Sequence, residues 1–105
     1  MAATSILKSW EQAPNSGLKR LLFITPNTAD ATDTLAITLT DYGISATGLL
    51  AVQSWKHTTD GSVIVTEANT TAVSSGVLTV TIPAGTDNDM RVVEVIGRAD
   101  AGVFA

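Results

Sequence analysis

The alternation of apolar and polar residues between Ser75 and Arg98 constrains the fold of this chain more than any other feature. Leu78, Val80 and Ile82 fall on one face and threonines fall on the other, which is the period-2 pattern of a half-buried β-strand. The segment Pro83 to Asp89 then interrupts the pattern with residues that turns favour. The alternation resumes afterwards and continues to the end of the stretch. The sequence therefore predicts a β-hairpin here.

The return strand of this hairpin, Met90 to Arg98, carries apolar residues on both of its faces. The segment Leu18 to Thr25 has the same property, with Leu22 and Ile24 opposite Leu21 and Phe23 in the alternation. A chain of this length covers only two inward faces with its own residues. We therefore expect the second faces of these strands to meet the arm, the tail or another subunit.

The rest of the chain repeats short runs of branched and aromatic residues separated by turn residues, and no apolar stripe of helical spacing persists for the roughly 10 residues that a helix needs. The predicted fold class is all-β: a small antiparallel β-sandwich or barrel of about six to eight short strands with an extended N-terminal arm. Strands are expected at 18–25, 34–40, 44–55, 62–67, near 71–73, at 77–82 and at 90–98.

The chain divides into an arm at 1–17, a β-domain at 18–98 and a tail at 99–105. The break Pro14-Asn15-Ser16-Gly17 indicates that the arm is a leader and not an element of the sheet. Either the arm folds back and covers its own sheet, or Trp10 anchors it on a neighbouring subunit. The residues expected at an interface are the apolar ones of the arm and the tail: Ile6, Leu7, Trp10, Val103 and Phe104.

Composition limits the classes of partner. Charged residues make up only 15 % of the chain and the mean hydropathy is +0.28, which suggests that a partner covers part of the apolar surface. The net charge of −4 and the scattered basic residues argue against nucleic-acid binding. No segment has the length of a membrane span, and Met1 to Leu7 does not resemble a signal peptide. We expect a soluble, unprocessed protein, and the absence of cysteine fits assembly in the cytosol.

Candidate catalytic and metal residues are few. His57 is the single histidine, and it is expected to be an exposed residue beside a hairpin turn. One histidine without cysteine does not supply a structural zinc site, and no nucleophile-elbow motif accompanies the serines. The run Asp87-Asn88-Asp89 begins like a calcium loop, but the required glycine is missing and Arg91 stands where an oxygen is needed. An ordinary acidic turn is expected there, as at Asp30 and Asp33, and the sequence predicts no enzyme, cofactor or metal.

Two further motifs bear on binding. The triplet Asn69-Thr70-Thr71 matches the glycosylation sequon, which arises often by chance in a threonine-rich chain. Trp55 lies at a strand end and is the aromatic residue best placed to stack on a sugar, although packing at the rim of the core is the simpler interpretation. These features keep a binding module, such as an adhesin or a tail-associated receptor-binding or glycan-binding domain, in view as an alternative function.

The chain resembles small phage head-decoration proteins, also called capsid cement proteins. The resemblance is carried by TADATDTLAITLTDYGI at 28–44, by SGVLTVTIPAGTDND at 75–89 and by the short arm before the β-domain. It implies a β-rich, cysteine-poor virion protein, made in the host cytoplasm, that binds the major capsid protein, is often trimeric and stabilises the capsid surface. It assigns no role to an individual residue.

Overall fold

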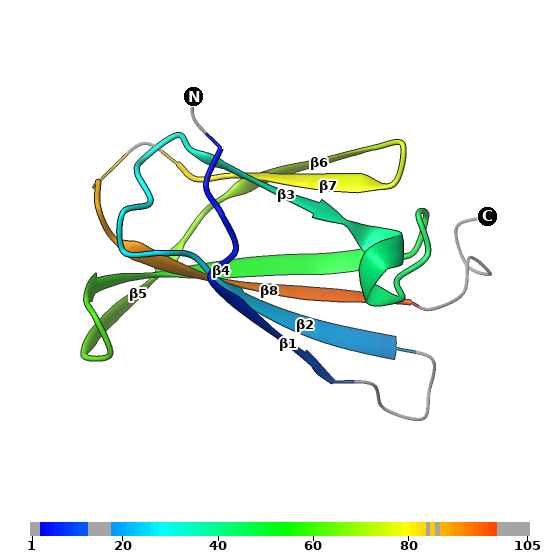
Figure 1. Cartoon of the computed structure of the whole chain (residues 1–105), viewed down its shortest axis with the longest axis horizontal. Coiled ribbons are helices and arrows are strands. Elements are labelled where there is room, and N and C mark those ends of the chain that lie inside the picture. Colours follow the sequence, from blue (N-terminus) through cyan, green and yellow to red (C-terminus); the bar gives the residue numbers. More distant parts are fainter. Residues whose placement is uncertain (1–2, 13–17, 84, 86, 99–105) are drawn as a thin grey trace.

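The structure is a computed structural model of the 105-residue chain, and it describes residues 3–12, 18–83, 85 and 87–98. The described residues form eight strands and one short 3-10 helix (Figure 1). In chain order these are β1 (Lys8–Gln12), β2 (Leu18–Ile24), β3 (Thr34–Thr38), η1 (Leu39–Tyr42), β4 (Leu49–Thr59), β5 (Val63–Glu67), β6 (Thr70–Ser74), β7 (Val77–Thr81) and β8 (Met90–Arg98). The predicted all-β class is confirmed.

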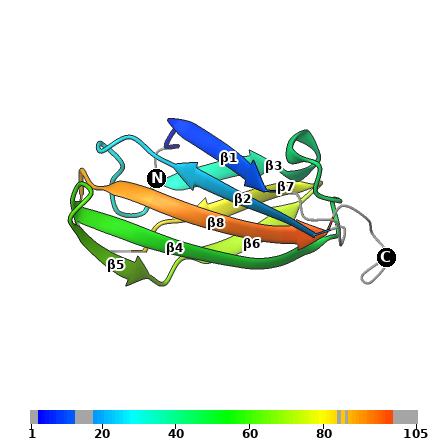
Figure 2. The same ribbon diagram turned by 90° about the horizontal axis from the view of Figure 1, so that it is seen from below.

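The strands form two antiparallel sheets of unequal size, packed as a sandwich. The larger sheet has the order β1-β2-β8-β4-β5, and the smaller has the order β3-β7-β6. Figure 2 shows the two layers, with β8 running through the middle of the larger one. Of the two architectures that the sequence left open, sandwich and barrel, the structure has the sandwich.

The core lies between β3 and β7 on one side and β2 and β8 on the other. Phe23 of β2 is fully buried, and the ring of Tyr42 in η1 packs edge-on against it at a centroid distance of 5.1 Å. Strands β5 and β6 contribute no buried residue to the described part of the core. The buried apolar cluster consists of Leu21, Phe23, Leu35, Ile37, Leu39, Ile44, Leu78, Val80, Val93 and Val95.

The predicted hairpin between Ser75 and Arg98 is wrong, although the strand from Met90 to Arg98 is confirmed. The two alternating strands belong to different sheets: β7 pairs with β3 and β6, whereas β8 pairs with β2 and β4. Leu78 and Val80 therefore face Val93 and Val95 across the core. Alternation identifies the inward face of a strand but does not identify its hydrogen-bonded neighbour.

The prediction that the arm is not an element of the sheet is also wrong. Lys8 to Gln12 form β1, an edge strand that pairs along its whole length with β2. Just before it the chain contacts the smaller sheet, where Ala3 forms a bridge with Thr34 and the Thr4 N–H donates to the Thr34 carbonyl at 2.8 Å. The first described residues thus cross from one sheet to the other and close that side of the sandwich, as Figure 1 shows.

Some strand ends differ from the sequence prediction. β3 gives way to η1 at Leu39, and η1 ends at Tyr42. Gly43 follows it with a left-handed φ of 78°. β4 begins at Leu49 instead of Ile44, and it continues to Thr59 through residues that were expected to form a turn. Ile44 was expected to begin a strand, but it lies outside the sheet, where its buried side chain packs close to Gly97 of β8.

The close contact at Gly97 gives a test of the packing. A Cβ added there would lie 2.7 Å from the Ile44 Cγ2 atom and 3.2 Å from the Gly48 carbonyl oxygen. We expect Gly97→Ala to lower the free energy of unfolding by about 1 to 3 kcal/mol, because an overfilled site must shift its neighbours. The matched control is Gly85→Ala, where an added Cβ meets nothing within 4 Å. Urea unfolding of both variants measures the difference, and equal stabilities would contradict this packing.

Candidate interaction surface

The outward side of the five-stranded sheet, called the outer face below, is rich in apolar side chains. Strand register places Trp10 of β1, Leu22 of β2 and Glu94 of β8 in one row across the sheet. The next row contains Ile24, Val92 and Trp55. Leu22 and all three residues of the second row are half-buried by their neighbours in the sheet. The second apolar face expected for β2 and β8 is therefore present, and it lies on the outside of the sandwich.

The outward side of the three-stranded sheet has a different character. On β3 it presents Ala36 and Thr38, which are exposed, and on β7 it presents Thr79 and Thr81. All five residues of β6, Thr70–Ser74, are exposed as well. Small hydroxyl side chains remain hydrated at little cost, whereas large contiguous apolar surfaces mark interaction sites. The outer face of the larger sheet is thus the better candidate for a contact.

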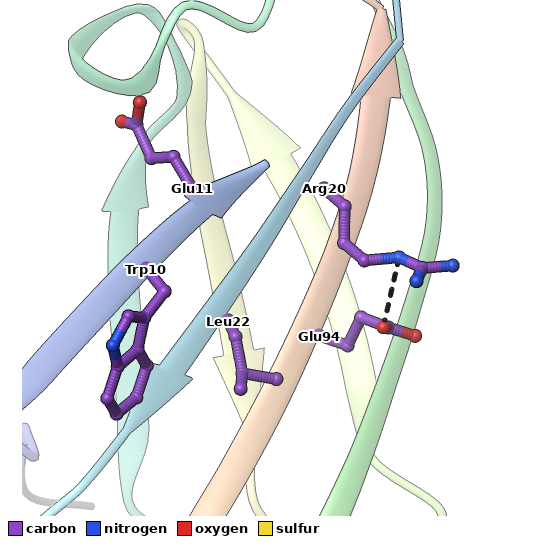
Figure 3. A pocket seen from close by; sticks show the side chains of 5 residues that line it. All are labelled: Trp10, Glu11, Arg20, Leu22 and Glu94. Carbon is purple, nitrogen blue, oxygen red and sulfur yellow. Dashed lines mark ion pairs between the residues drawn. The ribbon is translucent and has the colours of Figure 1, made fainter. Parts of the chain in front are cut away.

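A hollow of about 320 Å³ lies on the outer face at β1 and β2 (Figure 3). Trp10 and Leu22 form its apolar part, and Glu11 also lines it. On the far side Arg20 Nε lies 3.2 Å from Glu94 Oε2 in an ion pair. The Trp10 side chain is 45 % exposed, and so an aromatic ring stands open to solvent beside a charged pair.

The five residues predicted at an interface have different locations. Ile6 is half-buried and packs against the core, so it holds the arm to its own domain. Leu7 is 64 % exposed and Trp10 is 45 % exposed, and both remain accessible to a partner. The Lys8 ammonium lies 5.3 Å from the centre of the Trp10 ring. Val103 and Phe104 lie outside the described residues.

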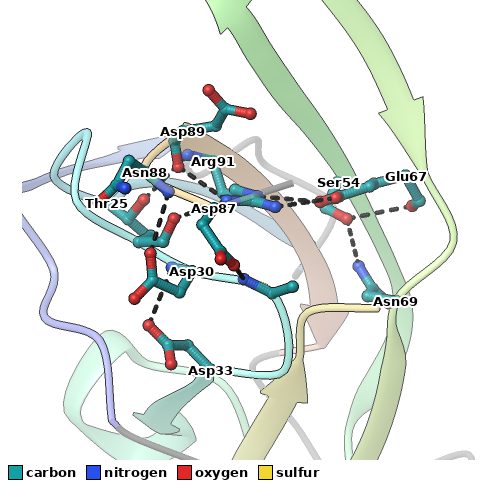
Figure 4. A network of polar contacts seen from close by, with 12 residues as sticks. Thr25, Asp30, Asp33, Ser54, Glu67, Asn69, Asp87, Asn88, Asp89 and Arg91 are labelled. Carbon is teal, nitrogen blue, oxygen red and sulfur yellow. Dashed lines mark hydrogen bonds and ion pairs between the residues drawn. The ribbon is translucent and has the colours of Figure 1, made fainter. Parts of the chain in front are cut away.

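At one end of the sandwich a buried arginine joins several segments (Figure 4). Arg91 of β8 is fully buried, and its Nε and Nη2 atoms donate to the two carboxylate oxygens of Glu67 at 3.3 and 3.2 Å. Its Nη1 atom donates to the carbonyls of Ala29 and Asp89. The Arg91 N–H also donates to the Thr25 hydroxyl at 2.9 Å. A planar guanidinium suits this bidentate pairing.

The acidic residues considered for calcium act as acceptors for loop backbone groups. Asp33 accepts a bond from the Asp30 N–H, and Asp30 accepts one from the Asn88 N–H, each at 3.0 Å. Asp87 accepts one from the Ala31 N–H at 3.0 Å. These bonds hold the 25–33 loop against the 87–89 turn. Within the described ranges no cluster of three or more metal-ligating side chains occurs.

The other residues singled out in the sequence have structural contacts. His57 is buried, not exposed as predicted, because β4 continues past it and its Nδ1 atom accepts a hydrogen bond from the Gly61 N–H at 3.1 Å. The Asn69 amide donates to the Ser54 hydroxyl at 2.6 Å. Trp55 is half-buried on the outer face, in the row that follows Trp10.

Sequence reasoning missed the buried role of Arg91. The signal was available, because Arg91 alternates in phase with Val93 and Val95, both of which point inward. The sequence did not reveal the partner of Arg91. Glu67 is distant along the chain, and its strand β5 is separated from β8 in the sheet by β4.

Comparisons with family models, curated proteins and solved structures found no match to this chain. Among the residues that the structure describes, no helix is long and apolar enough to cross a membrane.

The ion pair of Arg91 makes a clear prediction about stability. We expect Glu67→Gln to lower the free energy of unfolding by about 3 kcal/mol, because it removes the negative charge that lies 3.2 Å from a fully buried guanidinium. Glu11→Gln is the matched control: its partner Lys19 lies 3.3 Å away, but the Glu11 side chain is 45 % exposed, and such pairs contribute about 0 to 1 kcal/mol. Chemical unfolding compares the two, and an equal loss in both variants would refute the role of Arg91.

Proposed function

We propose that this protein is a non-enzymatic structural component of a virion, where it decorates and stabilises the capsid surface. The observation that carries the proposal is the contrast between the two outward sides of the sandwich. One side carries mostly small hydroxyl residues. The other carries apolar residues on neighbouring strands, the half-buried Leu22, Ile24, Val92 and Trp55 and the exposed Trp10, beside the Arg20–Glu94 ion pair. A protein with one docking side and one hydrated side is suited to coat a surface.

The polar residues add support. The carboxylates of Asp30, Asp33 and Asp87 bind backbone N–H groups of the loops, and His57 closes the β4–β5 turn. These side chains serve the fold, and the low charge fraction of 15 % agrees with a surface that is partly covered in its working state. The resemblance to capsid decoration proteins supplies the kind of partner, the major capsid protein, and favours a trimer on the lattice.

A second candidate function, a receptor-binding or glycan-binding module, rests on the hollow at Trp10. An exposed aromatic ring stacks on the apolar side of a sugar, and the Arg20–Glu94 pair beside it offers polar partners for hydroxyl groups. The Lys8 ammonium near the same ring competes for that position.

Trp10→Ala tests the docking surface. We expect the affinity for undecorated capsids to fall by about 30-fold, or about 2 kcal/mol, because tryptophans at the centre of an interface dominate binding. The free energy of unfolding should change by only about 1 kcal/mol, since nearly half of the side chain is already exposed. The control is Val73→Ala on the other sheet, which is 42 % exposed. Equal capsid affinities for Trp10→Ala and the parent protein would refute the proposed docking surface.

The class of function is tested by mixing purified protein with capsids of the virus that encodes it, prepared without this protein. The protein should add stoichiometrically and raise the temperature or force at which the capsids rupture. If the protein does not bind these capsids and instead binds a glycan or a host receptor saturably, the structural proposal fails and the binding-module proposal replaces it.

A further inference from the structure

The free edge of β5 is the least protected strand edge in the described part of the molecule. β5 ends the five-stranded sheet, so among the described residues no strand neighbours its outer backbone groups. Three consecutive large apolar residues, Val63, Ile64 and Val65, are 48, 51 and 42 % exposed. Natural edge strands are blunted by lysine, proline or a bulge. β5 contains none of these, since the local irregularity in pairing lies on β4 between His57 and Thr59.

The other three edges differ from β5. The β1 edge carries charged residues, and Glu11 is paired there with Lys19. The β3 edge is partly covered by Ala3 and Thr4. β6 is uncharged but presents only one large apolar residue, Val73. Glu67 is the single acidic residue of β5. It does not place a charge at the free edge of the strand, because its carboxylate points inward to Arg91.

The sequence of β5 is complementary to itself in antiparallel pairing. With Ile64 opposite Ile64 of a second copy, Val63 lies opposite Val65, Ser62 opposite Thr66, and Gly61 opposite Glu67. No two like charges oppose one another in this register, and the apolar residues meet on both sides of the sheet. In an antiparallel pair, two residues that lie opposite each other form either a hydrogen-bonded or a non-hydrogen-bonded pair. A two-fold axis between the two Ile64 residues is compatible with both kinds, so a ladder of hydrogen bonds can form in either case. The arrangement is isologous, which is the commonest symmetry of protein dimers.

We infer that β5 is a self-association edge, on which a second copy of this chain adds its own β5 about a two-fold axis at Ile64. The two larger sheets then form one continuous sheet across the pair. Val63 and Val65, which the smaller sheet of the same copy leaves uncovered, pack against their counterparts. The pairing is a two-fold contact at a free edge and is additional to any trimer contact on the capsid lattice. Ile64 lies on the outer face at that edge, but the inference does not use the rest of the outer face and does not depend on what that face binds.

The absence of natural cysteine makes a direct test possible. In this register the two copies of residue 64 stand directly opposite, with Cα atoms about 4.5 to 5.5 Å apart, a separation that a disulfide spans. We expect Ile64→Cys to form a covalent dimer rapidly under mild oxidation, as seen by non-reducing electrophoresis. Val73→Cys, on the other exposed edge strand, should cross-link at least about tenfold more slowly. Equal cross-linking rates in the two variants would overturn the inference.

A second measurement uses charge. Ile64→Lys places two ammonium groups opposite each other, and sedimentation should show a lower association mass than for the parent protein at the same concentration. Val73→Lys should keep the parent mass, and thermal melting should show that both variants are folded. An association mass unaffected by Ile64→Lys would contradict pairing through β5, whether or not the protein binds capsids.

Discussion

The unequal width of the two sheets is the constraint on which the rest of the structure depends. Three strands cannot cover the inner side of five, so the core is confined to the overlap of β3 and β7 with β2 and β8. On one side the first described residues bridge both sheets, and Ile6 packs on the core there. On the other side β5 and β6 contribute nothing buried. The apolar surface that remains exposed is the surface through which we propose that this protein associates.

Arg91 closes the loop end of this sandwich. Burying a charge costs several kcal/mol, and only close ionic and hydrogen-bonding partners offset that cost. Here the partners come from β5, the 25–33 loop and the turn before β8. Each of these segments has few buried apolar residues of its own. The hydrogen bonds and the ion pair of Arg91 therefore hold the segments together, where a larger core would otherwise do so.

The sequence predicted the fold class and most strands because alternation is local. Leu78, Val80 and Ile82 were correctly predicted to share the buried face of their strand. Pairing is not local, and this is why the supposed hairpin is a connection between two sheets. β1 was missed because its residues, KSWEQ, show no apolar alternation and owe their extended form to β2. Of the candidate site, Trp10 was predicted as an accessible contact residue, whereas the apolar outer face required strand register to define it.

We propose that the outer face of the larger sheet is the side that meets the capsid. A cryo-electron microscopy reconstruction of decorated capsids tests it most directly, because it shows which side of the sandwich lies against the shell. We predict that Trp10 and Leu22 lie at the contact and that the threonine-rich side of the smaller sheet faces solvent. A reconstruction in which the smaller sheet or the Asp60-Gly61 turn contacts the shell, with Trp10 open to solvent, would contradict the account.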